Sequence, residues 1–387
     1  MEVEIEKKIV DGVLTIKVKG KVDANNAPEF EGAVMNDVLK ASSVLIDASE
    51  LAYISSAGLR VILKIKKAVK DTQVVDATPE AYDIFQMTGF TEMMKISKKL
   101  REVSVEGCKV IGHGYYGTIY RLSKDTIVKV YGRGLELERI ENERELARKA
   151  FVLGVPTAIP MDIVKVGNEY GSIFELLDAE TLCERLIRDV NNLDKYVKQS
   201  VDVLKIIHAA ELKPGELADK KEEVLGWAKE IQPMLPKDVG SRVVSLVKGI
   251  KDDNHMLHGD YHIKNVMMIG EDPFIIDMDT LSMGSPIFEL GFMYSSYVGY
   301  QEIDHDNAMQ FFGVDHEHLI NFFNRSIEMY CNGYTNNQIQ LVIKKCRILC
   351  YIQLINRFDK YKDHPELLER FKKQIAELVY EVEDLNL

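Results

Sequence analysis

The chain has 387 residues, 46% hydrophobic and 28% charged, which is enough for two or three globular domains with buried cores. Its net charge of −12 disfavours nonspecific binding to nucleic acid or anionic lipid, and no apolar run approaches the roughly 20 residues of a membrane span. Five scattered cysteines without a CxxC spacing and a charged N-terminus without a signal-peptide core predict a cytoplasmic protein without disulfides or a cysteine metal site.

The first hundred residues alternate between the two main sequence periodicities. Short apolar or alternating runs predict strands, and apolar residues at helical spacing predict the helices between them. An alternation of this kind is typical of an α/β layer. The predicted strands are residues 12–20, 42–49 and 73–75, and the predicted helices lie within residues 22–39, 51–70 and 79–87.

Four separated motifs of this region resemble the STAS family, the anti-sigma-factor antagonist domain. They are Gly20–Asp23, Leu45–Asp47, Tyr53–Leu59 and Val75–Phe90, in the family's order. The resemblance implies an α/β STAS domain, a mixed sheet with helices, over residues 1–102, which regulates the protein or docks a protein partner.

The same resemblance makes Ser56 a candidate for phosphorylation by a kinase. A helix N-terminus stabilises an added phosphate through its free N–H groups and its dipole. Two observations argue for other roles: Ser55 stands where the family often has an acidic residue, and Ser56 could simply cap the helix.

A glycine-rich segment opens the second part of the chain. Gly112, Gly114 and Gly117 form a GxGxxG pattern, but the residues that follow are β-branched and aromatic. These residues predict two antiparallel strands and not the helix of a dinucleotide-binding fold. A glycine hairpin of this kind lets backbone N–H groups approach nucleotide phosphates.

A lysine follows the glycines inside the second apolar strand. Lys129 is unusual there unless its ammonium has partners, which phosphate oxygens and a carboxylate would supply. Glu143 on the following helical segment is our candidate carboxylate, and Glu145 competes with it.

The segment HGDYHIKN, residues 258–265, carries the chemistry. Two short apolar runs follow it, separated by the turn signal GEDP, and a hairpin about Glu271–Asp272 brings Asn265 and Asp277 to one end. Asp260 lies five residues before Asn265. Phosphoryl transfer uses such a set: a carboxylate for the attacking hydroxyl and two hard oxygen ligands for Mg²⁺.

Together with the segment IIDMD, this octet resembles the aminoglycoside phosphotransferase and choline kinase family. The resemblance implies an α+β, bilobal protein kinase-like fold, with an N-lobe over residues 103–178 and a helical C-lobe over residues 179–387. It also implies Asp260 as catalytic base, Asn265 and Asp277 as Mg²⁺ ligands, and Lys129 on the α/β-phosphates of ATP, with Gly112, Gly114, Gly117 and Glu143 completing the nucleotide site.

The predicted function is an ATP- and Mg²⁺-dependent phosphotransferase for the hydroxyl of an aminoglycoside-, choline- or sugar-like small molecule. Residues 105–387 hold 34 Lys and Arg against 45 Asp and Glu, which is compatible with a cationic acceptor. Two alternatives remain open: a protein serine kinase that targets a STAS serine, and a nucleotide-sensing regulator of an anti-sigma pathway. No nucleic-acid or membrane partner is predicted.

Overall fold

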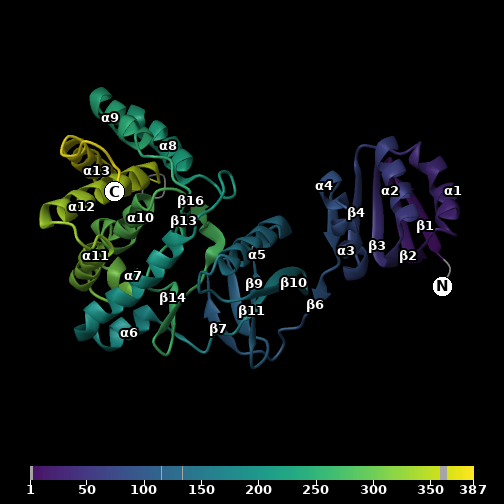
Figure 1. Ribbon diagram of the computed structural model, residues 1–387, viewed down its shortest axis with the longest axis horizontal. Coiled ribbons are helices and arrows are strands. Elements are labelled where there is room, and N and C mark those ends of the chain that lie inside the picture. Colours follow the sequence, from purple (N-terminus) through teal and green to yellow (C-terminus); the bar gives the residue numbers. More distant parts are fainter. Residues whose placement is uncertain (1–2, 115, 133, 358–363) are drawn as a thin grey trace. The chain divides into compact units, whose positions relative to one another are not determined.

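The computed structural model describes residues 3–114, 116–132, 134–357 and 364–387. The chain packs into two compact units, coloured along the sequence in Figure 1. The N-terminal unit comprises residues up to Ser104 with Val164–Asn168, and the C-terminal unit comprises Val105–Ile163 and Glu169–Leu387. Each has a separate cluster of buried apolar side chains. Each unit therefore has a core of its own.

The N-terminal unit is built on a five-stranded sheet with the order β1-β2-β3-β4-β5. The first two strands are antiparallel and the other neighbours are parallel. The predicted α/β layer is confirmed, but the sheet has one more long strand than the sequence patterns predicted, β1. The elements are β1 (Glu4–Val10), β2 (Val13–Val22), α1 (Ala27–Val38), β3 (Ser43–Ile54), α2 (Ser56–Ala68), β4 (Thr72–Ala77), α3 (Pro79–Met87), α4 (Phe90–Met93) and β5 (Ile96–Lys98).

The start of α2 differs from one interpretation of the sequence. Ser55, in extended conformation, is the N-cap residue, and its side chain accepts a hydrogen bond from the Gly58 N–H at 3.4 Å. Ser56 is the first helical residue and is exposed to solvent. The interpretation of Ser56 as the cap is therefore wrong, because a cap needs the non-helical backbone that Ser55 has.

The second sheet has the strand order β6-β10-β11-β9-β8-β7 and lies mainly in the other unit, although β6 and the end of β10 are counted with the N-terminal unit. Helix α5 (Leu137–Val152) connects β9 to β10, and residues 176–179, which contain the predicted boundary between the lobes, follow β11. This sheet carries the glycine hairpin and Lys129. The strands are β6 (Arg101–Glu102), β7 (Val110–His113), β8 (Gly117–Arg121), β9 (Thr126–Tyr131), β10 (Pro160–Val166) and β11 (Glu169–Glu175).

The rest of the chain is mainly helical. Helix α12 is buried on most of its surface, as expected for a helix in the centre of a bundle, and among the described residues no helix is long and apolar enough to cross a membrane. The helices are α6 (Leu182–Arg188), α7 (Leu193–Ala209), α8 (Lys220–Ile231), α9 (Lys237–Lys248), α10 (Ile287–Tyr297), α11 (His316–Tyr330), α12 (Asn336–Asn356) and α13 (Pro365–Leu378); short strands between them are β12 (Glu180–Thr181), β13 (Met256–Leu257), β14 (Val266–Ile269), β15 (Asp272–Ile275) and β16 (Ser282–Met283).

The five cysteines are free thiols and differ in exposure. Cys108, in the segment between β6 and β7, is partly exposed, whereas the other four are buried in the C-terminal unit. Burial raises the pKa of the Cys183 thiol to about 11 and that of Cys350 to about 12. The buried thiols therefore stay protonated at neutral pH.

Candidate active site

The two strands predicted after Gly117 are β8 and β9, which pair in antiparallel register, and the three glycines lie one step earlier, in the hairpin of β7 and β8, which we call the glycine hairpin. Strands β7 and β8 pair in antiparallel register, and the Gly114 N–H donates to the Gly117 oxygen at 2.8 Å. A Cβ at Gly117 would lie 2.1 Å from the Val130 oxygen, whereas a Cβ at Gly112 would meet Ile119 at an ordinary 3.5 Å. Only Gly117 is therefore required by the packing of the strands themselves.

Lys129 on β9 joins the sheet to two acidic residues. Its Nζ lies 2.8 Å from Glu143 Oε1 on α5 and 3.4 Å from Asp277 Oδ1. Glu145, the competing candidate, is exposed and pairs instead with Arg144 and Arg148. The geometry thus selects Glu143 as the partner of Lys129.

The surroundings of Lys129 keep it charged. Its side chain is only 15% exposed, and this burial alone would lower its pKa. The carboxylates of Asp277 and Glu143 outweigh the burial and raise the pKa above its ordinary value. Lys129 is therefore a fixed ammonium group at the base of the glycine hairpin.

The loop after β13 holds His258 and Asp260 in a defined arrangement. The Asp260 N–H donates to His258 Nδ1 at 3.3 Å, so the other ring nitrogen, Nε2, is the donor to the Ile276 oxygen at 3.0 Å. The network thus assigns a neutral His258. Gly259 has a φ of 86°, and a Cβ there would lie 2.3 Å from the Thr280 oxygen. Glycine is required at this position.

Asn265 and Asp277 lie at the open end of the hairpin formed by β14 and β15, in which Val266 pairs with Ile275. The turn is at Gly270–Glu271, one residue earlier than predicted, because Gly270 supplies the positive φ of 60°. The Asn265 Nδ2 donates to the main-chain oxygen of Asp260 at 3.0 Å, and the main-chain oxygen of Asn265 accepts from the Ile276 N–H at 2.9 Å.

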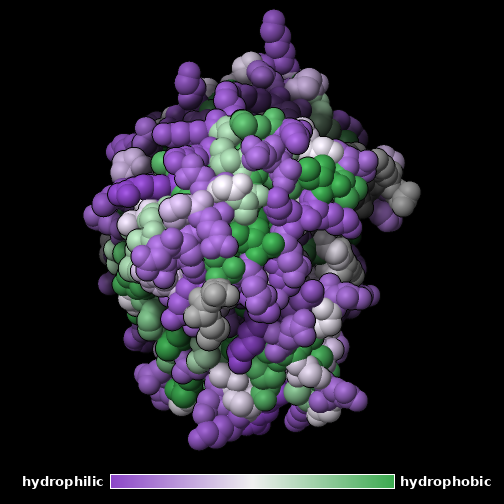
Figure 2. Space-filling view, turned by 90° about the vertical axis from the view of Figure 1, so that its right-hand side faces the viewer, coloured by the Kyte–Doolittle hydropathy of each residue, from purple (hydrophilic) through white to green (hydrophobic). Residues whose placement is uncertain are grey.

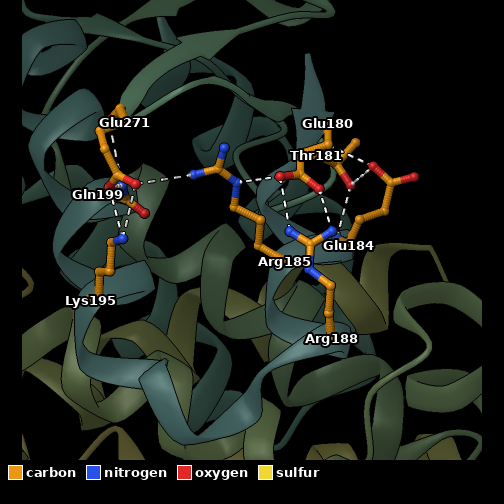
Figure 3. A network of polar contacts seen from close by, with 8 residues as sticks. All are labelled: Glu180, Thr181, Glu184, Arg185, Arg188, Lys195, Gln199 and Glu271. Atoms are coloured by element: carbon orange, nitrogen blue, oxygen red, sulfur yellow. Dashed lines mark hydrogen bonds and ion pairs between the residues drawn. The ribbon is translucent and has the colours of Figure 1, made fainter.

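The opposite end of this hairpin is held by a polar network, which Figure 3 shows from close by. Glu271 at the turn pairs with Lys195 of α7 at 2.9 Å and accepts from Gln199 at 3.0 Å. Arg185 of α6 lies between Glu271 and Glu180, 4.0 Å from the first and 2.8 Å from the second. Exposed pairs contribute little singly, but this network fixes the hairpin to two helices.

Sequence reasoning missed Glu289, which binds the backbone of the loop from His258 to Asn265. Its side chain is fully buried, and its carboxylate accepts the backbone N–H groups of His258 and Gly259. Burial alone would raise the pKa of Glu289, but the neighbouring His208 and the Gly259 N–H outweigh it and lower the pKa. A lone glutamate in the apolar run PIFELGFMY was the available signal.

His262 was also missed. It is buried, and its Nε2 lies 3.8 Å from Asp260 Oδ2, while its ring packs edge-on against Phe311 and Phe312. Burial lowers the pKa of His262, so the ring is neutral. Asp260 itself is exposed over about half of its side chain, at 53%, and is therefore open to an incoming molecule.

The carboxylates of Asp277, Glu143 and Asp279 lie around Lys129. Burial, then the carboxylates of Asp277 and Glu143, raise the pKa of Asp279 to about 6. No group of three or more His, Cys, Asp or Glu side chains in the described part of the chain has the arrangement of a metal site. The residues that could hold a divalent cation are Asp277 and Asn265, whose Nδ2 is already bonded and whose amide oxygen can act as a ligand. Two protein ligands suit Mg²⁺, which usually retains waters and phosphate oxygens.

Two family models match the chain one after the other. The STAS domain model matches residues 4–103, and the model described as "Phosphotransferase enzyme family" matches residues 107–317. The second match covers more than half of the chain. It includes the glycine hairpin, Lys129 and the whole segment from His258 to Asp277.

A curated protein of Bordetella bronchiseptica shows similarity to one part of the chain. This protein, "Putative anti-sigma factor antagonist BtrV", is 30% identical over 105 residues, which cover 26% of this chain and 90% of the relative. The relative thus corresponds to a single domain of this longer chain.

Several solved structures are similar in outline. A thermostable mutant of aminoglycoside phosphotransferase APH(4)-Ia with ADP and hygromycin B has 10% identity and a TM-score of 0.48, covering 71% of this chain and 96% of that one. ADP-bound APH(2'')-Ib has 16% identity and a TM-score of 0.49, covering 77% of this chain and 98% of that one. A choline/ethanolamine kinase family protein from Mesorhizobium loti has 15% identity and a TM-score of 0.47, covering 71% of this chain and 92% of that one. The family assignment rests on the family models.

Proposed function

The chain belongs to the phosphotransferase enzyme family, with a STAS domain before a protein kinase-like fold, and on this premise we propose that it transfers a phosphoryl group from ATP to a small molecule. The enzyme is a kinase that acts on hydroxyl groups. The observation that carries the proposal is the Lys129–Asp277 contact of 3.4 Å, because it joins β9, which pairs with the β8 strand of the glycine hairpin, to the segment that follows β15.

Asp260 is the proposed catalytic base. Its carboxylate is half-exposed, while its backbone N–H is bonded to His258 and its oxygen to Asn265. The main chain is therefore fixed and the carboxylate is free to orient an acceptor hydroxyl and receive its proton. Glu289 and His262 are positioning residues: Glu289 binds the backbone of the loop, and His262 lies 3.8 Å from the carboxylate of Asp260.

Lys129 is the proposed ligand of the α/β-phosphates, and Glu143 holds its ammonium in place. The backbone N–H groups of the glycine hairpin would cover the phosphates. Asn265 and Asp277 would hold Mg²⁺, which when bound offsets negative charge on the phosphates. The charged Lys129 is positioned before any nucleotide arrives, which favours electrostatic preorganisation.

We propose a cationic acceptor. The support is the acidity of the C-terminal part and two exposed carboxylates, Asp304 and Asp306, on the segment that follows α10. Glu302 is less suited, since its carboxylate accepts from the Tyr351 hydroxyl at 3.0 Å. The Asp304→Asn, Asp306→Asn double variant should raise KM for amine-bearing acceptors and leave KM for ATP unchanged; an unchanged acceptor KM would contradict this assignment.

The experiment that tests the function is ADP release from ATP with a panel of hydroxyl acceptors: amino sugars, amino alcohols and neutral sugars. We expect release that requires both Mg²⁺ and one acceptor class, and that Asp260→Ala abolishes. Calorimetry without Mg²⁺-dependent nucleotide binding at millimolar ATP would contradict the proposed donor. Nucleotide binding without turnover on any acceptor would favour the nucleotide-sensing alternative.

A serine kinase acting on the STAS domain is the second candidate, and one observation favours it. Ser56 is exposed at the first turn of α2, and the capping task belongs to Ser55. The STAS domain would then dock an anti-sigma-type partner, and a phosphate on Ser56 would alter the binding of that partner. Transfer of labelled phosphate from ATP to Ser56, together with the loss of this label in Asp260→Ala, would establish this candidate. An unlabelled Ser56 would exclude autophosphorylation there.

A further inference from the structure

Strand β1 leaves one side of the N-terminal sheet open. It has seven residues, Glu4–Val10, and pairs with β2 alone among the described strands. Figure 1 shows it as the outermost strand of this sheet. The opposite edge strand, β5, has only three residues. The outward N–H and C=O groups of β1 therefore form the longer template for pairing with another strand.

The two faces of β1 differ in chemistry. Ile5, Lys7 and Ile9 lie opposite buried residues of β2 and on the side of α1, where Lys7 Nζ bonds the Ala33 oxygen and Asp37. Ile9 is nevertheless 48% exposed, because no strand lies beyond it among the described residues. The residues between them point to the other face, where Glu6 is opposite Lys17 of β2 and Lys8 is opposite Thr15.

The occupant that β1 fits best is a second β1. In an antiparallel ladder, two residues that lie opposite each other direct their backbone N–H and C=O groups either both toward the other strand or both away from it. In a symmetric pair of β1 strands, the twofold axis therefore passes between the two copies of one residue and not between two neighbouring positions. With the axis at Lys7, all seven residues are paired: Ile5 faces Ile9 twice and Glu6 faces Lys8 twice. An axis at Lys8 gives no pair of opposite charges, and an axis at Glu6 places two glutamates face to face and pairs only five residues.

We propose that two copies of this chain join edge to edge through β1, antiparallel and centred on Lys7. Each Glu6 then lies between Lys17 of its own chain and Lys8 of the other, which extends an alternating row of charges that begins at the Lys17–Glu50 pair of 2.6 Å. On the other face, Ile9 is covered by Ile5 of the other copy. Cross-strand pairs of both kinds stabilise sheets.

One contact of this arrangement is unfavourable. The two Lys7 side chains face each other at the axis, and an inward-pointing lysine is one way in which proteins block an edge. Here each Lys7 is already neutralised by Asp37 at 2.6 Å, and the hydrogen bond from Lys7 lowers the pKa of Asp37. The face of the molecule in Figure 2 shows only separate small apolar patches (green), so backbone pairing and matched side chains must supply the specificity.

The test is the mass of the full chain in solution, by sedimentation over a wide concentration range. We expect a rise with concentration from 44.0 kDa to twice this value. Lys8→Glu places like charges opposite each other twice and should weaken association about tenfold or more. Glu6→Lys combined with Lys8→Glu restores both pairs and should restore the dimer.

Lys95→Glu is the matched control, since it makes the same charge change beside β5 at the other edge of the same sheet. Circular dichroism of each variant confirms that it is folded. A wild-type mass of 44.0 kDa at every concentration would overturn the proposal. So would a dimer that Lys8→Glu leaves intact, or a folded double variant that remains monomeric.

Discussion

The glycine hairpin and the catalytic loop lie on the two sides of the proposed site, and they are held by different means. Strands β7 and β8 are held by their ladder of backbone hydrogen bonds, and most of their residues are partly exposed. The loop from His258 to Asn265 is largely buried and is held by side chains, above all Glu289. One side is a pairing of strands, and the other is a polar network.

This difference fits what each side would do in the proposed reaction. Phosphates are bound by N–H groups, which every strand residue supplies, so the hairpin needs space more than particular side chains. Proton transfer needs a carboxylate placed to within a fraction of an ångström, which only a network of committed hydrogen bonds provides. The catalytic loop should therefore respond to single side-chain changes, and the hairpin mainly to changes that fill space.

The largest effect is expected at Asp260. Asp260→Ala removes the proposed base and should lower kcat by about 10²–10⁴-fold, while nucleotide affinity stays within about twofold because Lys129, Asn265 and Asp277 are intact. ADP release and calorimetry measure the two quantities. Asp272→Ala, an exposed aspartate at the other end of the same hairpin region, is the control and should be active. Full turnover in Asp260→Ala would assign the base elsewhere.

Glu289→Gln tests the network directly. Glutamine removes the negative charge and replaces one acceptor oxygen with an NH2 donor that would face a backbone N–H, so the variant should lose about 1–3 kcal/mol of stability and roughly tenfold or more in kcat. Glu222→Gln on the exposed side of α8 is the control. A variant with wild-type stability and kcat would show that the loop is held by other contacts.

The difference in stability between the wild type and Glu289→Gln should depend on pH, and the direction of this dependence follows from the pKa of Glu289. The pKa of Glu289 is below its ordinary 4.5 in the folded protein, so its charge stabilises the fold fully above about pH 4.5. The stabilisation is lost as the pH falls through the folded pKa. Denaturant titrations should therefore show the gap between wild type and Glu289→Gln narrowing below pH 4.5; a gap that widens on acidification would contradict the assignment of an ionised Glu289.

Two glycine variants probe the hairpin. Gly117→Ala forces β8 away from Val130 and should raise KM for ATP several-fold and lower stability by about 1–3 kcal/mol. Gly112→Ala meets only an ordinary contact with Ile119 and is the matched control. Thermal unfolding and steady-state kinetics measure both. Equal effects at the two positions would show that space between β8 and β9 does not decide nucleotide binding.

The smallest effect is expected from removal of the STAS domain. Deletion of residues 1–98 leaves β6 and the separate core of the C-terminal unit, so turnover of a small acceptor should change by no more than about twofold. A loss of activity much larger than this, in a folded truncated protein, would show that the STAS domain takes part in the reaction.

Local sequence patterns predicted the strands and turns that depend only on residues near each other in the sequence. The β-branched runs after Gly117 gave the hairpin, and the GEDP turn placed Asn265 and Asp277 at one end. Strand β1 escaped because Glu6, Lys7 and Lys8 conceal its alternation. Glu289 escaped because its partners lie 30 residues earlier in the chain, and only the folded backbone brings their N–H groups to it.

The uneven exposure of the cysteines provides a practical tool. At neutral pH the four buried thiols are neutral and inaccessible, so a maleimide should react with Cys108 first. Cys108 lies in the short segment between the last strand of the STAS part and the first strand of the glycine hairpin. A fluorophore attached there, in the unmodified chain, would report on rearrangements of the connection between the two units when nucleotide or a protein partner binds.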